Sequence, residues 1–270
     1  MDPSELARLE HENWIEYLAA SVSLADSSLV IRDRGIVALL GHVPMRFFNQ
    51  ILVEEPRASA SAIRDAVARA RERRDEFVVS LREGLDDRFA PLTAELGLAA
   101  SDDAVTSAMA LHPVRDGARP AGLEPGFEIR RVTDETGLED HRRTVTGGFG
   151  ADPSVAEAMI GIGLLDRPEC VVYVGYLDGL PVTSGLGWRT GRTIGVYNIA
   201  TIPAARRQGF GEAMTARVLA DGKGAGCDVG ALQASSMGRP IYQRMGFRMA
   251  LRYIGYVDSQ GSGVGGQPLV

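Results

Sequence analysis

Thr193 to Gly222, TIGVYNIATIPAARRQGFGEAMTARVLADG, is the stretch that decides the fold. Residues 194–202 are rich in β-branched and aromatic side chains, which predicts a buried strand, and Pro203 ends it because proline cannot donate to a β-ladder. After the turn at 206–211, residues 213–219 are apolar at helical spacing. A strand, a glycine-bearing turn and a helix are typical of an anion site, because free N–H groups and the positive end of the helix dipole face one point.

This loop differs from the better-known phosphate loops. It lacks the Gly-Lys-Ser/Thr ending of a Walker A motif and the G-x-G-x-x-G spacing of a dinucleotide site, and no acidic residue closes a second strand at the expected distance. Taken alone, the segment is equally compatible with a tight turn that binds nothing.

A second segment follows, Cys227 to Phe247, CDVGALQASSMGRPIYQRMGF. Its pattern predicts a strand at 229–233, a short helix at 236–244 that stops at Gly246, and a last strand at 247–256. A left-handed glycine is a common end for such a helix. The two segments together therefore predict strand, loop, helix, strand, helix, strand.

The two segments resemble the GNAT acetyltransferase superfamily. Arg206, Gly209 and Gly211 match the family's loop Arg/Gln-x-x-Gly-x-Gly/Ala. The family's next helix commonly ends in Tyr-x-x-x-Gly-Phe, a pattern matched at the end of the second segment by Tyr242, Gly246 and Phe247. The resemblance covers roughly residues 126–258, about half of the chain, and has both motifs in the family's order and at its separation.

The first half of the chain repeats this order of elements at an offset of 149 residues. The offset places Arg57, Ala60 and Ala62 on the loop and Gly97 on the glycine stop, while Thr93 replaces Tyr242. Methyl groups at the two loop positions would crowd a diphosphate, and threonine cannot supply the acid chemistry assigned below to the tyrosine. We therefore expect a degenerate, non-catalytic repeat that serves packing or shapes the substrate cleft.

The predicted fold class is α/β (α+β), with two GNAT-like domains, each a mixed, largely antiparallel central sheet flanked by helices. We expect a degenerate domain at 1–116, a Gly- and Pro-rich linker at 117–126, a catalytic domain at 127–258 and a flexible tail at 259–270. In the finer pattern we predict, among others, strands at 46–53 and 104–111 and a helix at 154–165.

Composition excludes several other classes. The net charge of −6 argues against general nucleic-acid binding, which favours a basic face. No apolar run reaches the length of a membrane span, and the charged N-terminus lacks a signal-peptide core, so we expect a cytoplasmic protein without a membrane partner. The two cysteines and four histidines are scattered, which predicts buried thiols rather than a disulfide, and no metal site.

If the resemblance holds, the co-substrate is an acyl-CoA, most simply acetyl-CoA. The N–H groups of the loop would hold the pyrophosphate, Arg207 could reach the same phosphates or the 3′-phosphate, and the end of the central strand would pair with the pantetheine. Ser235 stands where many members carry an asparagine, which leaves its contact open. The cofactor-binding set is Ala200, Thr201, Ile202, Arg207, Gln208, Gly209, Phe210, Gly211, Glu212 and Ser235.

The implied reaction is direct transfer of the acetyl group to a primary amine. A central-strand N–H within 199–201 is the candidate donor to the carbonyl oxygen, and Tyr242 resembles the family's general acid to the departing thiolate, although it could equally be a packed aromatic. The general base stays unassigned. Asn198 and Tyr197 could orient a water, and Glu139 or His141 could come near the cleft, but each has a simpler reading as a surface or core polar residue.

Two function hypotheses from different classes remain. The first is an N-acetyltransferase acting on a small-molecule or protein amine; the second is a non-catalytic acyl-CoA-binding or scaffold protein. The retained loop and tyrosine of the second half favour the enzyme. The acceptor, the acyl-chain preference and the choice between monomer and homodimer cannot be read from the sequence.

Overall fold

The computed structural model describes residues 1–115 and 122–258. The first half of the chain forms the following elements: α1 (Pro3–Val22), β1 (Leu29–Asp33), β2 (Ile36–Leu40), β3 (Asn49–Val53), α2 (Ala60–Arg73), β4 (Val78–Arg82), α3 (Ala90–Glu95), β5 (Leu98–Ala100) and β6 (Thr106–Leu111). The second half forms β7 (Phe127–Arg131), α4 (Glu135–Phe149), α5 (Pro153–Met159), β8 (Cys170–Leu177), β9 (Leu180–Thr190), β10 (Thr193–Thr201), α6 (Phe210–Gly224), β11 (Val229–Ala234), α7 (Arg239–Arg244) and β12 (Arg248–Asp258).

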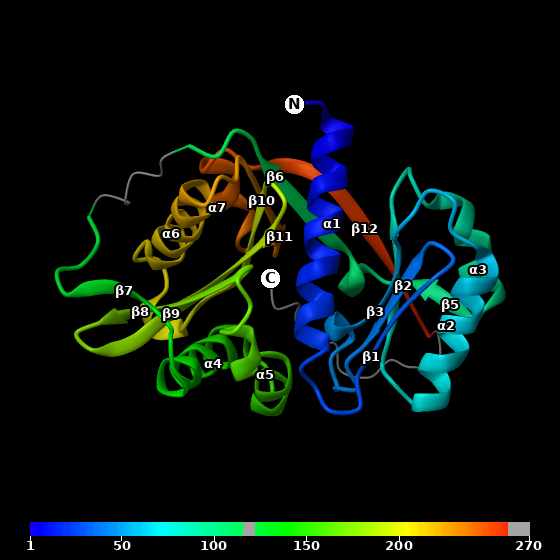
Figure 1. Ribbon diagram of the computed structural model, residues 1–270, viewed down its shortest axis with the longest axis horizontal. Coiled ribbons are helices and arrows are strands. Elements are labelled where there is room, and N and C mark those ends of the chain that lie inside the picture. The colour runs from blue at the N-terminus through cyan, green and yellow to red at the C-terminus, as the bar shows by residue number, and fades with distance from the viewer. Residues whose placement is uncertain (116–121, 259–270) are drawn as a thin grey trace.

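Both halves build the same core of strands and helices (Figure 1). In each half an antiparallel pair leads to a strand that runs parallel to its neighbour, β3 beside β4 and β10 beside β11. The helix that connects the parallel strands is α2 in one half and α6 in the other, and α3 lies 149 residues before α7. The predicted mixed α/β fold and the tandem arrangement are therefore confirmed.

The last strand of each half lies in the sheet of the other half. β6, from the first half, pairs with β11, while β12, from the second half, pairs with β4 and β5. β6 and β12 also pair with each other, which joins the described strands into one sheet of order β1-β2-β3-β4-β12-β6-β11-β10-β9-β8-β7. Neither sheet is complete without a strand from the other half.

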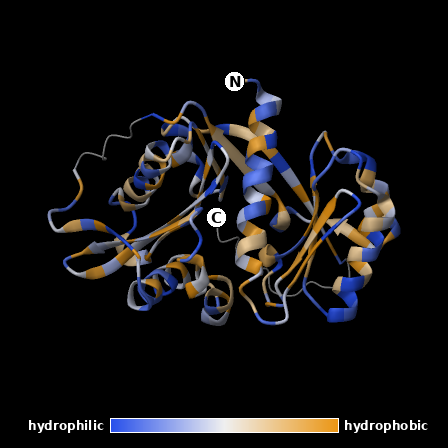
Figure 2. Ribbon diagram, viewed as in Figure 1, coloured by the Kyte–Doolittle hydropathy of each residue, from blue (hydrophilic) through white to orange (hydrophobic). Residues whose placement is uncertain are grey.

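Helix α1 stands between the halves, where Figure 1 shows it crossing the centre of the molecule. Its buried side chains join a core that also contains α4, α5 and the inner faces of both sheets. Separate apolar clusters lie under α2 on the outer face of the first half and under α6 and α7 in the second. Strands β2 and β3 are covered on both faces, so they are buried at every position, and their apolar residues give orange stretches in Figure 2.

Some local predictions differ from the structure. The strand predicted at 46–53 begins only at Asn49, after a short 3-10 helix. The helix predicted at 154–165 ends at Met159, because Gly161 and Gly163 disfavour its continuation, and a 3-10 turn follows. Part of the predicted linker and all of the predicted tail lie outside the described residues. Within those residues, no helix has the length and apolar character needed to cross a bilayer.

Candidate functional site

The parallel pairing of β10 with β11 stops early. Only Thr193 to Gly195 pair with β11, whereas pairing with β9 on the other side continues to Thr201. In the first half the equivalent strands β3 and β4 pair through Leu52, one residue before β3 ends. In the described structure, residues 196–201 of β10 are therefore not paired with β11. This open backbone edge has no equivalent at the corresponding strands of the first half.

A bulge interrupts β10 within this open edge. The register with β9 shifts between Tyr197 and Ala200, and Asn198 has a positive φ of 54°. Asparagine tolerates this left-handed conformation better than most residues because its short amide can bond locally. The Ser184 hydroxyl donates to the Asn198 carbonyl oxygen at 2.9 Å. The bulge thus re-aims backbone groups in the middle of the predicted site.

Beyond the bulge, the end of β10 is partly occupied by contacts within the protein. The Thr183 hydroxyl donates to the Ala200 carbonyl at 2.7 Å, and the Ile202 N–H donates to the Val182 carbonyl at 3.1 Å. The Thr201 carbonyl accepts from Arg206 Nε at 3.2 Å. Of the three residues expected to meet the pantetheine, Ile202 has its N–H already engaged.

The glycine loop leads directly into α6. Arg206 also donates to the Gly148 carbonyl at 2.7 Å, so its guanidinium ties α4 to the end of β10. Arg207 and Gly209 have φ values of 65° and 82°, and Gly209 occupies the N-cap position without a side-chain cap in the described structure. The N–H groups of the first helical turn have no carbonyl one turn earlier to accept them. They point out of the helix start at residues 210–212, beside the open edge of β10.

The remaining loop side chains have different surroundings. Phe210 is buried and its ring stacks on Phe127 at 4.4 Å, so it could serve a ligand only through its backbone. Gln208 is exposed, as is Arg207, whereas Glu212 is half-buried within 4.0 Å of Arg244. A Cβ at Gly211 would make only ordinary contacts, whereas the positive φ of Gly209 strains any other residue.

The corresponding helix start in the first half is closed by its own side chains. Ser59 caps α2, with its hydroxyl accepting from the Ser61 N–H at 3.3 Å. Arg34 donates to the Ser61 hydroxyl at 2.7 Å, and Arg88 contacts the Pro56 carbonyl of the same loop. A helix start with one of its N–H groups already capped is a poorer anion site than the uncapped start of α6.

Tyr242 lies on α7, on the side of the sheet that carries α6. It is 7% exposed, packs edge-on against Phe247, and its hydroxyl interacts with the Thr215 side chain of α6. Burial raises the pKa of Tyr242 to about 12, so the phenol keeps its proton at neutral pH. Ser235 begins the turn into α7, where its hydroxyl accepts from the Gly238 N–H at 3.1 Å.

The opposite side of the sheet carries a buried polar layer that joins Asn198 and His141, both considered from the sequence as site candidates, to Tyr17, which was not. Tyr17 of α1 donates to the Asn198 side chain at 3.2 Å, and His141 Nε2 lies 3.5 Å from the amide nitrogen of Asn198. Burial lowers the pKa of His141 to about 4. The polar partner of Tyr17 lies 181 residues away in sequence, so no local pattern could reveal the contact.

Glu10 is the second buried group of α1, and hydrogen-bond accounting gives it a proton. Burial lowers the pKa of His11 to about 3, so the ring is neutral; its Nε2 donates to the Val53 carbonyl at 2.8 Å, and its Nδ1 therefore accepts from the Tyr253 hydroxyl at 2.9 Å. The single phenol proton is then used, and the 3.1 Å contact between Tyr253 and Glu10 needs a proton on the carboxyl. Burial raises the pKa of Glu10 to about 8, in agreement.

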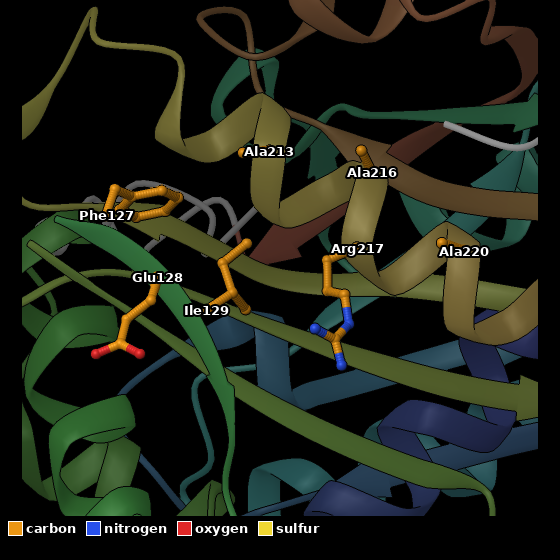
Figure 3. Close-up of a pocket in the computed structure, with 7 residues that line it drawn as sticks. All are labelled: Phe127, Glu128, Ile129, Ala213, Ala216, Arg217 and Ala220. Carbon is orange, nitrogen blue, oxygen red and sulfur yellow. The ribbon is translucent and has the colours of Figure 1, made fainter. Parts of the chain in front are cut away.

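A separate pocket of about 350 Å³ lies between β7 and α6 (Figure 3). Figure 3 shows three alanines of α6 on one side of the pocket and residues 127–129 of β7 on the other, with the Arg217 side chain extending away from the helix toward the strands. Arg217 is paired with Asp221 at 3.0 Å and lies over the Tyr173 ring. None of the sequence-predicted site residues lines this pocket.

Comparison with known proteins identifies the second half. Residues 168–249 match the family model of the acetyltransferase (GNAT) domain. This segment is a GNAT domain. It contains β10, the glycine loop, α6 and Tyr242, and the match supports an acetyltransferase of the GNAT type, as the two sequence motifs predicted. No protein of curated function matches the chain in sequence.

Solved structures show that the tandem GNAT fold extends over nearly the whole chain. A GCN5-related N-acetyltransferase from Kribbella flavida superposes with a TM-score of 0.70 at 17% identity, covering 94% of this chain and 96% of its own. A second, from Sphaerobacter thermophilus, gives 0.62 at 17% identity over 86% and 78% of the two chains. A tandem GNAT protein from the clavulanic acid biosynthesis pathway gives 0.60 at 13% identity over 95% and 96%. At these identities the similarity establishes the fold.

Proposed function

We propose that the second half transfers an acetyl group from acetyl-CoA directly to a primary amine. The observation that carries the proposal is the end of β10–β11 pairing at Gly195, beside the uncapped start of α6. An open backbone edge can pair with an extended amide-containing arm, and an uncapped helix start can bind phosphate. The GNAT domain contains both features, whereas the first half has its strands paired and its helix capped.

The proposed cofactor contacts follow from these features. The N–H groups of Gln208 to Glu212 hold the pyrophosphate, and the exposed Arg207 guanidinium reaches the phosphates. Ala200 and Thr201 offer backbone groups to the pantetheine. Ile202 contributes through its side chain or carbonyl, because its N–H is engaged. Ser235 lies at the carboxyl end of β11, on the far side of the opening between the strands.

The proposed reaction forms a C–N bond and breaks the C–S bond of the thioester. The neutral amine attacks the carbonyl carbon, and N–H groups of β10 within 199–201 stabilise the charge that develops on the oxygen. The Tyr242 phenol gives its proton to the departing thiolate, and the proton that leaves the amine passes to solvent through a base that we do not assign. The acceptor is a small-molecule or protein amine.

The first half, residues 1–116, is proposed to be non-catalytic, and residues 127–258 to carry the reaction. The capped start of α2 supports this division, as does Thr93 at the position equivalent to Tyr242. Thr93 uses its hydroxyl to donate to the Ala90 carbonyl at 2.8 Å. A cytoplasmic location, and a monomer or a homodimer as the working form, belong to the same proposal.

Calorimetric titration of acetyl-CoA into wild type and into Gly209→Glu tests the cofactor site. The variant forces a side chain into a left-handed backbone position and adds negative charge to the phosphate loop. We expect the dissociation constant to rise at least about 100-fold, equivalent to roughly 2.7 kcal/mol. Gly224→Glu is the matched control, because it places the same charge at the exposed far end of the same helix, where a Cβ meets nothing within 4 Å.

Each outcome of the titration has a clear meaning. Binding that is lost in Gly209→Glu and kept in Gly224→Glu, with both variants folded by circular dichroism, supports the site. Absence of binding to wild type would contradict the use of acetyl-CoA. Binding without release of CoA thiol across a panel of spermidine, glucosamine and a lysine peptide would favour the scaffold function for these acceptor classes.

A further inference from the structure

The Asn198 bulge is held by side chains from three elements. The Tyr17 hydroxyl of α1 donates to the Asn198 amide oxygen at 3.2 Å, and the amide nitrogen faces His141 Nε2 of α4 at 3.5 Å. The Ser184 hydroxyl of β9 donates to the Asn198 backbone carbonyl. Asn198 is 3% exposed, so water does not offer these groups an alternative partner.

The donors and acceptors of this cluster fit in one arrangement. His141 Nδ1 lies 3.0 Å from the Tyr173 carbonyl and must donate to it, which leaves Nε2 as an acceptor for the Asn198 amide nitrogen. The amide oxygen then faces Tyr17, whose hydroxyl must donate. The side chain of Asn198 therefore has a single satisfied orientation, and Tyr17 supplies one of its two side-chain bonds.

Tyr17 is itself fixed. Its ring stacks on the ring of Tyr197, with centroids 3.7 Å apart and planes 9° apart, and it is fully buried. Removal of the hydroxyl alone would leave this stack in place. The ring and the hydroxyl thus contact Tyr197 and Asn198, the two residues that precede 199–201, and both contacts come from the half of the chain that carries no proposed catalytic group.

We propose that Tyr17 is a positioning residue of the catalytic half, which fixes the Asn198 bulge so that one backbone N–H within residues 199–201 faces the thioester carbonyl. This inference rests on the proposed function. It gives the first half a defined part in the reaction: α1 sets the geometry of a donor on β10 without touching the substrate. Loss of the Tyr17 hydroxyl frees the Asn198 amide to rotate, and the bulge loses one of its anchors.

Two CoA derivatives test the inference without a known acceptor. Acetyl-CoA has the thioester carbonyl, and S-ethyl-CoA replaces that carbonyl with a methylene group. We expect wild type to bind acetyl-CoA about fivefold more tightly in calorimetry, the contribution of one hydrogen bond. In Tyr17→Phe the ratio of the two dissociation constants should fall to near one, while the affinity for S-ethyl-CoA stays within about twofold.

Matched variants separate positioning from stability. Tyr176→Phe removes a hydroxyl that donates to Asp140 at 2.8 Å, away from the bulge, and should keep the wild-type ratio. Asn198→Gly permits the positive φ but removes the clamp, so it should lower the ratio as Tyr17→Phe does, with little added effect in the double variant. It also tests the clamp if Tyr17→Phe does not fold.

The outcomes distinguish the positioning role of Tyr17 from the proposed acetyltransferase function on which it rests. A wild-type ratio near one, or a ratio that Tyr17→Phe leaves unchanged, would overturn the positioning role. Equal weakening of both derivatives in Tyr17→Phe would do the same, because it indicates a purely structural contribution. Failure of both derivatives to bind wild type would contradict the proposed function itself.

Discussion

Tyr242→Phe should lower kcat for amine acetylation by about 100- to 1,000-fold, within the usual contribution of a general acid. The phenol proton is what the departing CoA thiolate needs, and a buried tyrosine whose pKa is raised to about 12 retains that proton across the working pH range. Phenylalanine preserves the edge-on contact with Phe247 and removes only the hydroxyl. The affinity for acetyl-CoA should therefore change by less than about twofold.

The measurement is the rate of CoA thiol release at saturating acetyl-CoA, with an amine that supports turnover in wild type. Tyr173→Phe is the control, because this buried tyrosine also uses its hydroxyl in a hydrogen bond, to Asp221 on α6, yet has no role in the proposed reaction. Retention of kcat within about threefold in Tyr242→Phe would make Tyr242 a packing residue and leave the thiolate to be protonated by solvent.

Folding stability should be greatest near pH 6.5 and should fall by about 2 kcal/mol as the pH rises to 8, because Glu10 keeps its proton in the folded chain. Its pKa is raised from 4.5 to about 8, so between these values the native state binds a proton that the unfolded state releases. The contribution of Glu10 to the free energy of unfolding is fully present below pH 4.5. It decreases as the pH rises, by about 1.4 kcal/mol per pH unit.

The acid side of the same profile has the opposite sign. Burial lowers the pKa of His11 to about 3 and that of His141 to about 4, so below pH 6.5 the unfolded state binds protons that the native state excludes. Stability from these two groups is complete above pH 6.5 and is lost as the pH falls. Below pH 6.5 the two histidines change the free energy of unfolding more per pH unit than Glu10 does, and with the opposite sign. The free energy of unfolding is therefore greatest near the pKa of histidine in the unfolded chain.

Glu10→Gln is the test of the alkaline limb. An amide reproduces the protonated acid, since its NH2 group donates to Tyr253 and its oxygen accepts from Gln233. In urea titrations the variant should match wild type near pH 5 and should lack the decline between pH 6.5 and 8. Glu12→Gln, at an exposed site paired with Arg8, should retain that decline. A loss of about 2–3 kcal/mol in Glu10→Gln at every pH would instead indicate a buried carboxylate.

The sequence predicted the features that are encoded locally. The strand, glycine loop and helix of residues 193–222 are specified by neighbouring residues, and the two GNAT motifs follow one another within one domain. The repeat was visible because α3 and α7 keep the same offset. Phe210 shows the limit of such reasoning, because its place in the loop motif did not reveal that its ring packs against Phe127.

Features that depend on distant partners could not be predicted. β6 is buried at its four central positions and β12 alternates in its middle, and neither pattern states which half supplies the neighbouring strand. The same holds for Glu10 and Tyr17, which occupy the buried face of an amphipathic helix. Their polar partners, Gln233 and Asn198, become apparent only when the two halves are folded together.

The exchange of β6 and β12 constrains how this chain can change over time. Each half contains a strand encoded by the other, so either half on its own would have an incomplete sheet. A half without a proposed catalytic group would ordinarily be free to shrink or disappear. Here it must keep β4 and β5 to shelter β12, and β6 to flank β11, so it persists as an inherited part of its neighbour's sheet.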